Sequence, residues 1–561
     1  MSTIDDAGAQ AAPLDALLID AALGPLRRFA PDASTLKWGL GLAARPRTTT
    51  SRLLDLGAEL TKITTGASKV APDRRDRRFG DPAWSQNPLL RRLMQLHLAT
   101  SRTAEQLVDD ADLDWRDDQR TRFLLDNLVQ ALSPSNLPLV NPASAKAVID
   151  TGGLSLVRGG SQLIKDALTA PRVPEMVDGS GFEVGANIAA TPGAAVLRTE
   201  VFELLQYAPQ TKKVSKVPVL IVPPTINKYY AIDLAPGRSL IEHCVAQGRQ
   251  VFVMSWRNPD GRHAKWNFDT YVGAILEAVD AVERITGSDQ TVLGGICSGG
   301  ILASITAGYL AATDRLDRLA GLLLAVTVID SESSGTVSAL TTRRLAETAK
   351  AASKRKGYLD GRSLAEVFAW LRPGDLIWNY WVNNYLLGHK PPAFDILFWN
   401  ADTTRMTAGL HADFVDLSMD NTLTKPGELT VLGEPIDLQA VTVDAYVVAG
   451  STDHITPWQN CYRTTGLLGG DVRFVLSSSG HVAALVNPPG NPKASYRLNP
   501  TNPTDASEWL AGAETHKGTW WNDVTGWLDQ HCGTKVNAPK DLGSADLPPL
   551  ADAPGTYVYD S

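Results

Sequence analysis

Cysteine is scarce in this chain, which has only four among its 561 residues: Cys244, Cys297, Cys461 and Cys532. They are too few and too scattered for a disulfide framework, and no Cys-x-x-Cys pair indicates a zinc site. The nine histidines form no His-Glu-x-x-His motif or other paired spacing, so we expect neither a metal nor a cofactor. Such sparse cysteines are typical of a reducing cytoplasm, where a single thiol can serve for its reactivity.

The sequence also lacks an excess of positive charge. It has 53 Lys and Arg against 61 Asp and Glu, a net charge of −8. A nucleic-acid-binding surface must neutralise phosphates, so this balance argues against DNA or RNA as a partner. The short basic run at residues 74–78 is better explained as a solvated turn.

Long apolar runs are absent as well. The most apolar stretches are residues 217–222 and 319–329, whereas a membrane-spanning helix needs about 20 apolar residues. The first residues contain no basic segment followed by an apolar run, as a secretory signal would. We therefore predict a soluble cytoplasmic protein without a transmembrane segment, attached at most to a surface.

The N-terminal third shows helical patterning. Residues 1–48 are rich in Ala and Pro, lack a sustained period, and are predicted to form a flexible arm. From residue 51 to 132 the apolar residues recur at three- and four-residue steps, which indicates helices, and Gly and Pro punctuate residues 133–195. We predict a mainly helical N-terminal domain over residues 1–195.

From residue 196 to 561 short apolar strands alternate with helical stretches. The predicted strands lie at 217–222, 251–255, 291–293, 322–329, 445–449 and 472–476. Continuously apolar strands that alternate with helices are typical of a mainly parallel sheet covered on both faces. We therefore predict an α/β catalytic domain over this part of the chain.

An insertion at about residues 330–440 interrupts this alternation. It is far longer than an ordinary connection between a strand and a helix, so we predict a cap subdomain over one end of the sheet. The insertion is rich in aromatic residues, among them Trp370, Trp378, Trp381 and Trp399. These residues either pack the core of the cap or form an apolar surface for a substrate or a partner subunit.

The segment from Thr291 to Gly300 carries the most informative motif. A predicted strand runs into Gly295-x-Cys297-x-Gly299, and a helix is predicted to start near Ser298. This is the nucleophile-elbow pattern of an α/β-hydrolase fold, with Cys in place of Ser. The glycines allow a sharp turn that exposes the central side chain, and the helix N-terminus behind it favours negative charge. We predict Cys297 as the catalytic nucleophile.

The order of residues along the chain predicts the rest of a triad. In this fold an acid and then a histidine follow the nucleophile, each after a later strand. Asp453 follows the strand at 445–449 and His481 follows the strand at 472–476, so we predict them as acid and base. The alternatives are a turn or helix-capping aspartate and a surface-loop histidine. His454 competes as the base, but we interpret it as a supporting residue beside Asp453, because the base should come last.

The loop at residues 223–230 stands where this fold takes one backbone N–H of an oxyanion hole. The other N–H comes from the residue after the nucleophile, which here is Ser298. Ile226 or a neighbour is the candidate donor in the loop. The alternative is an ordinary Pro-rich end of a strand.

Cysteine in place of serine favours thioester chemistry. A cysteine that accepts an acyl group from a thioester stores it as another thioester, at nearly equal free energy, and can still pass it to a hydroxyl. His481 would take the thiol proton and later the proton of the acceptor alcohol, with Asp453 orienting the ring. The motif therefore predicts acyl transfer rather than plain ester hydrolysis.

Longer segments through most of the chain resemble polyhydroxyalkanoate synthases of the single-subunit kind. The matching segments are residues 81–84, 190–193, 224–230, 255–259, 295–299, 399–405, 479–481 and 487–493. The resemblance implies a synthase that polymerises (R)-3-hydroxyacyl-CoA into an intracellular polyester and releases CoA. It implies an α/β-hydrolase fold with a cap that acts as a gate over the cysteine.

The resemblance also implies roles for individual residues and partners. Cys297 matches the nucleophile of the family, His481 its histidine, and Asp453 its aspartate, which in the family also activates the 3-hydroxyl of the incoming unit. A homodimer, attachment to polyester granules in the cytoplasm, and no cofactor besides the CoA of the substrate are implied as well. Val482–Ala484 stand where medium-chain enzymes carry a polar residue, so the preferred monomer length stays open.

Two other functions are compatible with the motifs. The first is a hydrolase of the same fold, such as a thioesterase or an ester hydrolase. The second is a granule-coating or scaffold protein that kept the fold without the activity.

Overall fold

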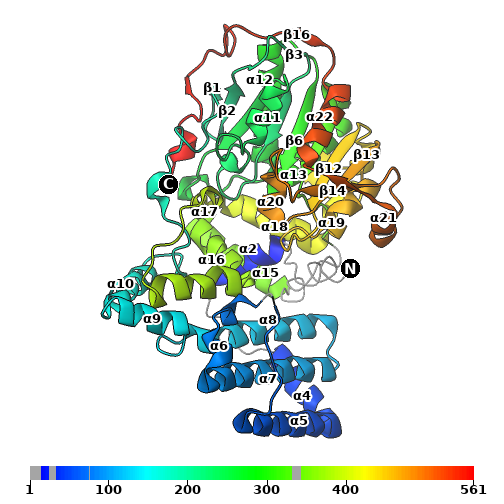
Figure 1. The fold of residues 1–561 in the computed structure, drawn as a ribbon. Coiled ribbons are helices and arrows are strands. Elements are labelled where there is room, and N and C mark those ends of the chain that lie inside the picture. The colour runs from blue at the N-terminus through cyan, green and yellow to red at the C-terminus, as the bar shows by residue number, and fades with distance from the viewer. Residues whose placement is uncertain (1–13, 25–32, 75, 332–342) are drawn as a thin grey trace.

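The central feature of the computed structural model is an 11-stranded sheet with helices on both faces (Figure 1). The structure describes residues 14–24, 33–74, 76–331 and 343–561. The strand order is β15-β14-β13-β12-β7-β6-β4-β5-β2-β1-β17. Six neighbouring strands in its centre are parallel, namely β4 (Val219–Val222), β5 (Val251–Trp256), β6 (Thr291–Ile296), β7 (Leu319–Ala325), β12 (Ala445–Gly450) and β13 (Val472–Ser477).

These six strands correspond to the six predicted from sequence, and the predicted α/β fold is confirmed. Several strands differ in extent: β6 runs on to Ile296, beyond the predicted end at residue 293, and β7 starts at Leu319 and ends at Ala325, not at residue 329. The next residue, Val326, takes a positive φ of 44°, which an extended strand does not allow. The chain therefore leaves the sheet at this point and enters the cap.

Antiparallel strands, which were not predicted, extend the sheet at both edges. One edge adds β2 (Phe202–Tyr207), β1 (Gly193–Arg198) and β17 (Ala551–Asp552), and the other adds β14 (Ser495–Leu498) and β15 (Glu514–Lys517). The pair of β1 and β17 joins residues 194–195 to residues 551–552. Residues near the end of the described chain therefore pair with β1, the first strand of the sheet along the sequence.

The two faces of the sheet belong to separate hydrophobic clusters because side chains alternate along each strand. Leu220 and Val222 on β4 pack with the helices α12 (Phe268–Thr286) and α13 (Ser298–Ala312). Val219 and Ile221 face the other way and pack with α11 (Leu240–Ala246) and α22 (Trp520–His531). This double cover explains why the central strands are apolar along their whole length.

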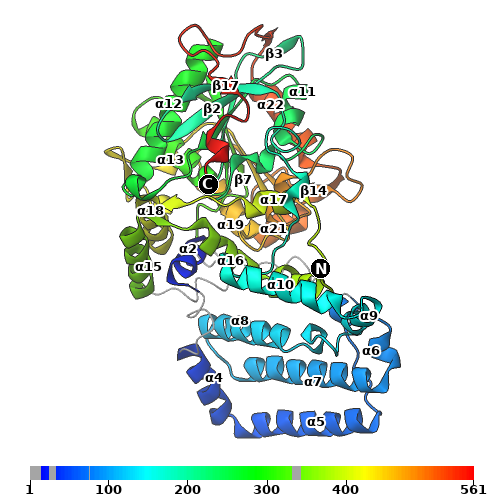
Figure 2. The same cartoon turned by 90° about the vertical axis from the view of Figure 1, so that its left-hand side faces the viewer.

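The predicted cap lies between β7 and β12. Its described elements include α15 (Arg343–Lys356), α16 (Gly361–Leu371), α17 (Asp395–Ala401), α18 (Ala408–Asp420) and the π-helical segments η7 (Gly374–Trp378) and η8 (Trp381–Leu386). Residues 332–342 of the predicted cap lie outside the described residues. In both views the cap lies between the sheet and a group of N-terminal helices (Figures 1 and 2).

The N-terminal helices form a layered group below the cap (Figure 2). They are α4 (Ala33–Ala44), α5 (Pro46–Thr65), α7 (Pro88–Asp110) and α8 (Trp115–Ala131), followed by α9 (Pro142–Asp150) and α10 (Leu154–Leu168). The helix α10 packs against η8, and the backbone of Tyr385 lies so close to Gly159 that no larger residue would fit there. None of the described helices combines the length and the apolar composition that crossing a membrane requires.

The prediction of a flexible arm over residues 1–48 is wrong for the parts of that arm which the structure describes. Residues 33–44 form α4, and the helix α2 (Leu14–Leu23) packs against α15, α16 and α18 of the cap. Leu18 of α2 is fully buried, and its carbonyl lies 3.3 Å from Nε2 of the buried His411 on α18. The remaining residues of the predicted arm, 1–13 and 25–32, lie outside the described residues.

Candidate active site

Cys297 stands in a strained turn between β6 and α13. Its backbone has φ 51° and ψ −121°, a region that residues other than glycine rarely adopt. A Cβ added to Gly299 would overlap the carbonyl oxygens of Val222 and Pro223, and one added to Gly300 would overlap the hydroxyl of Thr327. The glycines are therefore required for the close approach of α13 to β4, which holds the predicted elbow in shape.

The carboxylate of Asp453 is buried and fully hydrogen-bonded. It follows β12, accepts the backbone N–H groups of Ile455 and Thr456 at 2.8 and 2.9 Å, and lies 2.7 Å from Nδ1 of His481. Burial alone would raise the pKa of Asp453, but the charge of His481 and the hydrogen bonds hold this pKa below its usual value. Asp453 is thus held as an anion against the imidazole ring.

His481 connects Asp453 to Cys297. It begins the short helix α20 (His481–Leu485) after β13, and its ring lines the same cavity as the Cys297 thiol, close enough for the thiol to affect its pKa. Burial by itself lowers the pKa of His481, but Asp453 and Cys297 raise it to about 10. The structure therefore brings together the three residues predicted as nucleophile, acid and base, although they lie far apart in the sequence.

The two predicted oxyanion donors lie on either side of the elbow. Ser298 is the first residue of α13, where backbone N–H groups have no partner within the helix. Its hydroxyl accepts the backbone N–H of Thr225 at 3.0 Å and so ties the loop after β4 to the elbow. Ile226 follows and lines the cavity beside Cys297.

His454 lines the same cavity next to Asp453. Burial lowers its pKa to about 4, and the nearby charges of Arg372 and His481 act in the same direction, against Asp453. An imidazole with so low a pKa is a weak proton acceptor, which agrees with a supporting position better than with a second base. Its supporting role stays a prediction.

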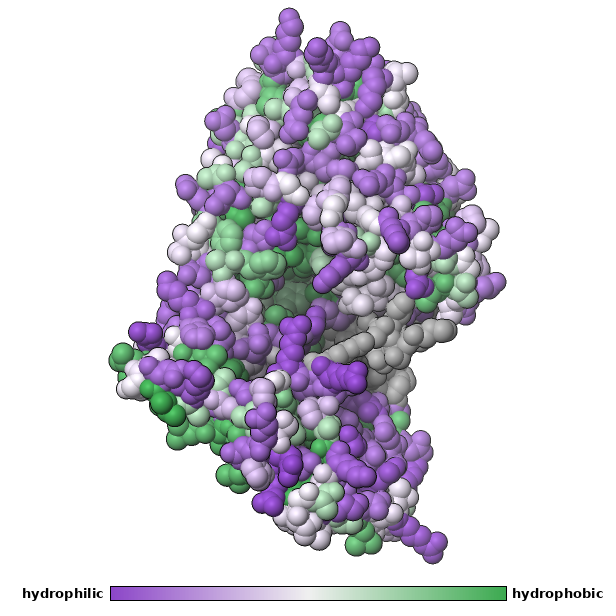
Figure 3. All heavy atoms as spheres, viewed as in Figure 1, coloured by the Kyte–Doolittle hydropathy of each residue, from purple (hydrophilic) through white to green (hydrophobic). Residues whose placement is uncertain are grey.

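A cavity of about 790 Å³ opens above Cys297 and His481. The cap supplies apolar side chains such as Phe368, Leu376, Ile396 and Trp399, and it adds the guanidinium group of Arg372 to the wall. Figure 3 shows a hollow with an apolar interior where Figure 1 places α17 and α20. A site of this size and lining can hold a largely apolar acyl group above the cysteine.

Comparisons with known proteins agree with this architecture. The model of the alpha/beta hydrolase fold matches residues 218–488, and the model of the poly-beta-hydroxybutyrate polymerase N-terminus matches residues 75–244. Poly(3-hydroxyalkanoate) polymerase 2 of Ectopseudomonas oleovorans is 46% identical over 91% of this chain and 91% of its own. This chain belongs to the poly(3-hydroxyalkanoate) polymerase family. The resemblance and the α/β-hydrolase fold are thereby confirmed, and the chain is an enzyme of a family of acyltransferases.

Other members of the polymerase family are similarly related. Poly(3-hydroxyalkanoate) polymerase 1 of the same organism is 44% identical over 92% of both chains. The polymerase subunit PhaC of Cupriavidus necator is 39% identical over 90% of this chain and 86% of its own. A solved esterase from Thermogutta terrifontis covers 53% of this chain and 92% of its own at 15% identity and a TM-score of 0.33, a likeness too low to inform the site.

Thr456 also belongs to the candidate active site, although the sequence did not predict it. Its Oγ1 donates to Asp453 Oδ2 at 2.6 Å and lies 3.1 Å from Nδ1 of His481. Thr456 thus contacts both Asp453 and His481. The available signal was its position three residues after Asp453 in the same turn, where a hydroxyl can bond back to the carboxylate.

The other three cysteines are buried, and Cys461 lies near the site, with its Sγ 3.7 Å from the Thr456 carbonyl. Burial raises the pKa of Cys244 to about 12, that of Cys532 to about 11, and that of Cys461 well above its usual value. They are therefore neutral thiols at physiological pH. Among the residues that the structure describes, no three His, Cys, Asp or Glu side chains lie together as metal ligands would.

Proposed function

We propose that the chain polymerises (R)-3-hydroxyacyl-CoA thioesters into a polyester and releases CoA, with the growing acyl chain held on Cys297. The observation that carries this proposal is the line Cys297–His481–Asp453 at a strained elbow beneath an apolar cavity. The names of the relatives support polymerisation of hydroxyalkanoates. A thiol nucleophile supports exchange between thioesters.

The acylation step uses these residues in turn. His481 holds the thiol proton as an imidazolium, in agreement with its raised pKa, and the Cys297 sulfur attacks the thioester carbonyl. The negative charge on the carbonyl oxygen is stabilised by the backbone N–H of Ser298 and by that of Ile226. The bond to the CoA sulfur then breaks, and CoA leaves with the proton that His481 held.

The elongation step joins two units. The 3-hydroxyl of one unit loses its proton to the His481–Asp453 pair and attacks the acyl group on Cys297. An ester bond forms, the bond to the Cys297 sulfur breaks, and the thiol takes the proton back. Asp453 keeps the ring oriented and stabilises the imidazolium in both steps, in agreement with the raised pKa of His481. No step requires a cofactor or a metal.

Granule association is the second part of the proposal. The helix α10 buries Ser155, Gly159 and Asp166 against its neighbours, while Val157 and Leu168 are 68% and 81% exposed. Figure 3 shows a green, apolar patch at the corner of the molecule where Figure 1 places α9 and α10. An outward apolar face of this kind is suited to an apolar polymer surface in the cytoplasm.

A homodimer is also proposed, because the family resemblance implies one. Sedimentation at several protein concentrations measures this oligomeric state.

Purified enzyme with 3-hydroxybutyryl-CoA tests the proposed reaction. We expect release of CoA together with insoluble polyester. Release of CoA with only free 3-hydroxybutyrate contradicts polymerisation and favours a thioesterase. Absence of CoA release from the unmodified enzyme favours a scaffold.

A further inference from the structure

Lys228 is buried beside the cavity but does not line it. The loop after β4 leads into the helical turn η4 (Tyr229–Ile232), and Ile226 and Asn227 line the cavity. The Lys228 side chain is only 4% exposed, and its Nζ donates to the backbone carbonyl of Asp560, 332 residues further along the chain. Burying an ammonium group without an acceptor is costly. This carbonyl therefore determines where Lys228 can lie.

The backbone of the same residue holds the cap. Trp399 on α17 lines the cavity, and its Nε1 donates to the carbonyl of Lys228 at 2.7 Å. Two residues on, the hydroxyl of Tyr230 donates to Asp402 at 2.7 Å. The oxyanion loop and the cap wall thus meet at Lys228.

Residues 560–561 also contact the cap and the end of β5. Asn258 donates to the carbonyl of Asp560 at 3.4 Å and accepts the backbone N–H of Arg405 at 2.8 Å. The Arg405 guanidinium donates to the carbonyl of Ser561 at 3.2 Å. The loop, the cap and the segment after β5 therefore all contact Asp560 or Ser561.

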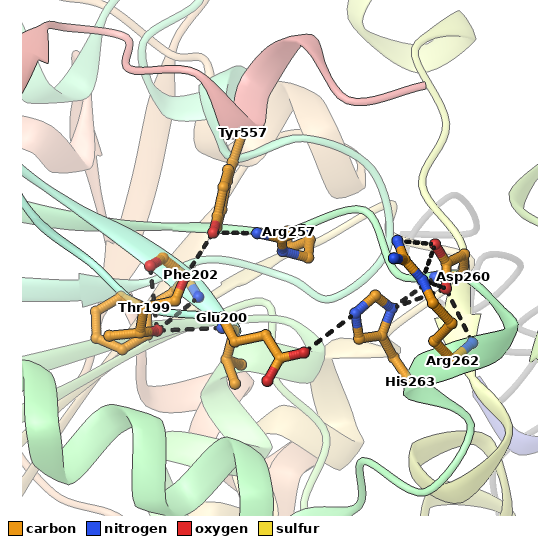
Figure 4. Close-up of polar contacts among 9 residues, drawn as sticks. Thr199, Glu200, Phe202, Arg257, Asp260, Arg262, His263 and Tyr557 are labelled. Atoms are coloured by element: carbon orange, nitrogen blue, oxygen red, sulfur yellow. Dashed lines mark hydrogen bonds and ion pairs between the residues drawn. The ribbon is translucent and has the colours of Figure 1, made fainter.

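Residues 556–557 fix this segment to the sheet independently of the cap. The buried carboxylate of Glu203 on β2 accepts the backbone N–H groups of Thr556 and Tyr557 at 2.7 and 2.8 Å. In Figure 4 the hydroxyl of Tyr557 points between Arg257 and Thr199, and it donates to the Thr199 carbonyl at 2.5 Å. A segment anchored in this way can hold residues 560–561 in place.

We propose that residues 556–561 form a strap that positions the cavity wall, and that Lys228 is the positioning residue through which the strap holds the loop carrying Ile226. The inference rests on the proposed function only through the role of that loop. A displaced loop no longer presents its N–H to the oxyanion, so the transition state is destabilised more than the bound substrate. The expected signature is a lower kcat with a nearly unchanged KM.

The test compares Lys228→Met with Lys535→Met. Lys535 on β16 (Lys535–Asn537) is the control, because its Nζ also donates to backbone carbonyls, those of Gln247 and Gly248, but at an exposed position that does not line the cavity. With 3-hydroxybutyryl-CoA as substrate, CoA release should show a kcat at least about tenfold lower in K228M, with KM within about twofold. K535M should change neither. An unchanged kcat in K228M, or equal losses in both variants, overturns the proposal.

A second variant keeps Lys228 and removes its acceptor, and so covers the case in which K228M does not fold. Deletion of residues 560–561 should lower kcat as K228M does, and the combined variant should lose no more than either change alone. Asp560→Ala retains the carbonyl and should keep kcat within about twofold. Losses that multiply in the combined variant contradict the strap.

Hydrogen exchange separates a failure of the strap from a failure of the proposed function. An enzyme that makes no polymer refutes the function, but exchange can still be measured at residues 223–230 and 399–405. Faster exchange of these residues in K228M than in K535M supports the strap. Equal exchange in the two variants refutes it.

Discussion

At the scale of single residues, the site depends on how Asp453 is held. Two backbone N–H groups and the hydroxyl of Thr456 surround its carboxylate, and His481 completes the set. Because all of these contacts favour the anion, the imidazole is presented to Cys297 in one orientation. A serine hydrolase needs the same geometry, so the thiol itself is what favours acyl transfer.

Thr456→Val tests the hydrogen bond from Thr456 to Asp453, which the order of residues along the chain did not predict. The substitution removes the hydrogen bond to Asp453, which is worth about 1.5–3 kcal/mol for a charged acceptor, so kcat should fall about tenfold. The pKa of Asp453 should rise, which moves the acidic limb of the kcat/KM profile to higher pH. Thr103→Val, in the buried middle of α7, is the control. An unchanged pH profile in T456V would assign Thr456 a purely structural role.

The raised pKa of His481 predicts a pH dependence of stability. A histidine has an unfolded pKa of 6.5, and the folded value is about 10. Its contribution to stability is therefore fully present below about pH 6.5 and is lost as the pH rises through about 10. The melting temperature should fall more between pH 7 and pH 9.5 in the unmodified protein than in His481→Asn. His389→Asn, at an exposed position, should behave like the unmodified protein.

At the scale of elements, the elbow needs α13 to lie almost in contact with β4. Gly299→Ala should cost about 1–3 kcal/mol of stability and abolish most activity, because the added methyl overlaps two backbone carbonyls. Gly273→Ala in α12 has open space around the added methyl and should stabilise the protein by about 1 kcal/mol. Calorimetry and CoA release distinguish the two variants. Full activity of G299A would mean that the elbow tolerates a shift of α13.

The apolar face of α10 leads to an element-scale prediction about the polymer surface. A variant with Val157→Glu and Leu168→Glu should bind polyester particles at least about tenfold more weakly in a co-sedimentation assay, because it charges that face. Its CoA release from soluble substrate should stay close to normal. Leu550→Glu charges another exposed leucine, 50% exposed, and should bind normally. Equal binding by all three proteins would exclude α10 as the contact.

The elements also show which features were predictable from sequence. The six parallel strands are continuously apolar because both faces are covered, so they could be recognised locally. The pairing of β1 with β17 could not, because its partners are separated by most of the chain and only the fold joins them. The docking of α2 was missed for another reason. Its residues are apolar without a helical period, and they are buried by contacts with the cap.

At the scale of the whole molecule, several parts of the chain surround the candidate active site. The sheet supplies Cys297, Asp453 and His481, the cap supplies the apolar wall, and residues 556–561 return to support that wall. The order of the three catalytic candidates was predictable because a single fold imposes it. The strap was not, because backbone carbonyls hold it together and they leave no sequence signature.

The most direct test of the central claim is mass spectrometry of the enzyme after brief mixing with 3-hydroxybutyryl-CoA. We predict hydroxyacyl units in thioester linkage on the peptide that contains Cys297, with one CoA released for each unit added. The adduct should be lost in Cys297→Ala and retained in Cys461→Ala. An adduct on another residue, or polymer formation by C297A, would contradict the assignment of Cys297 as the nucleophile.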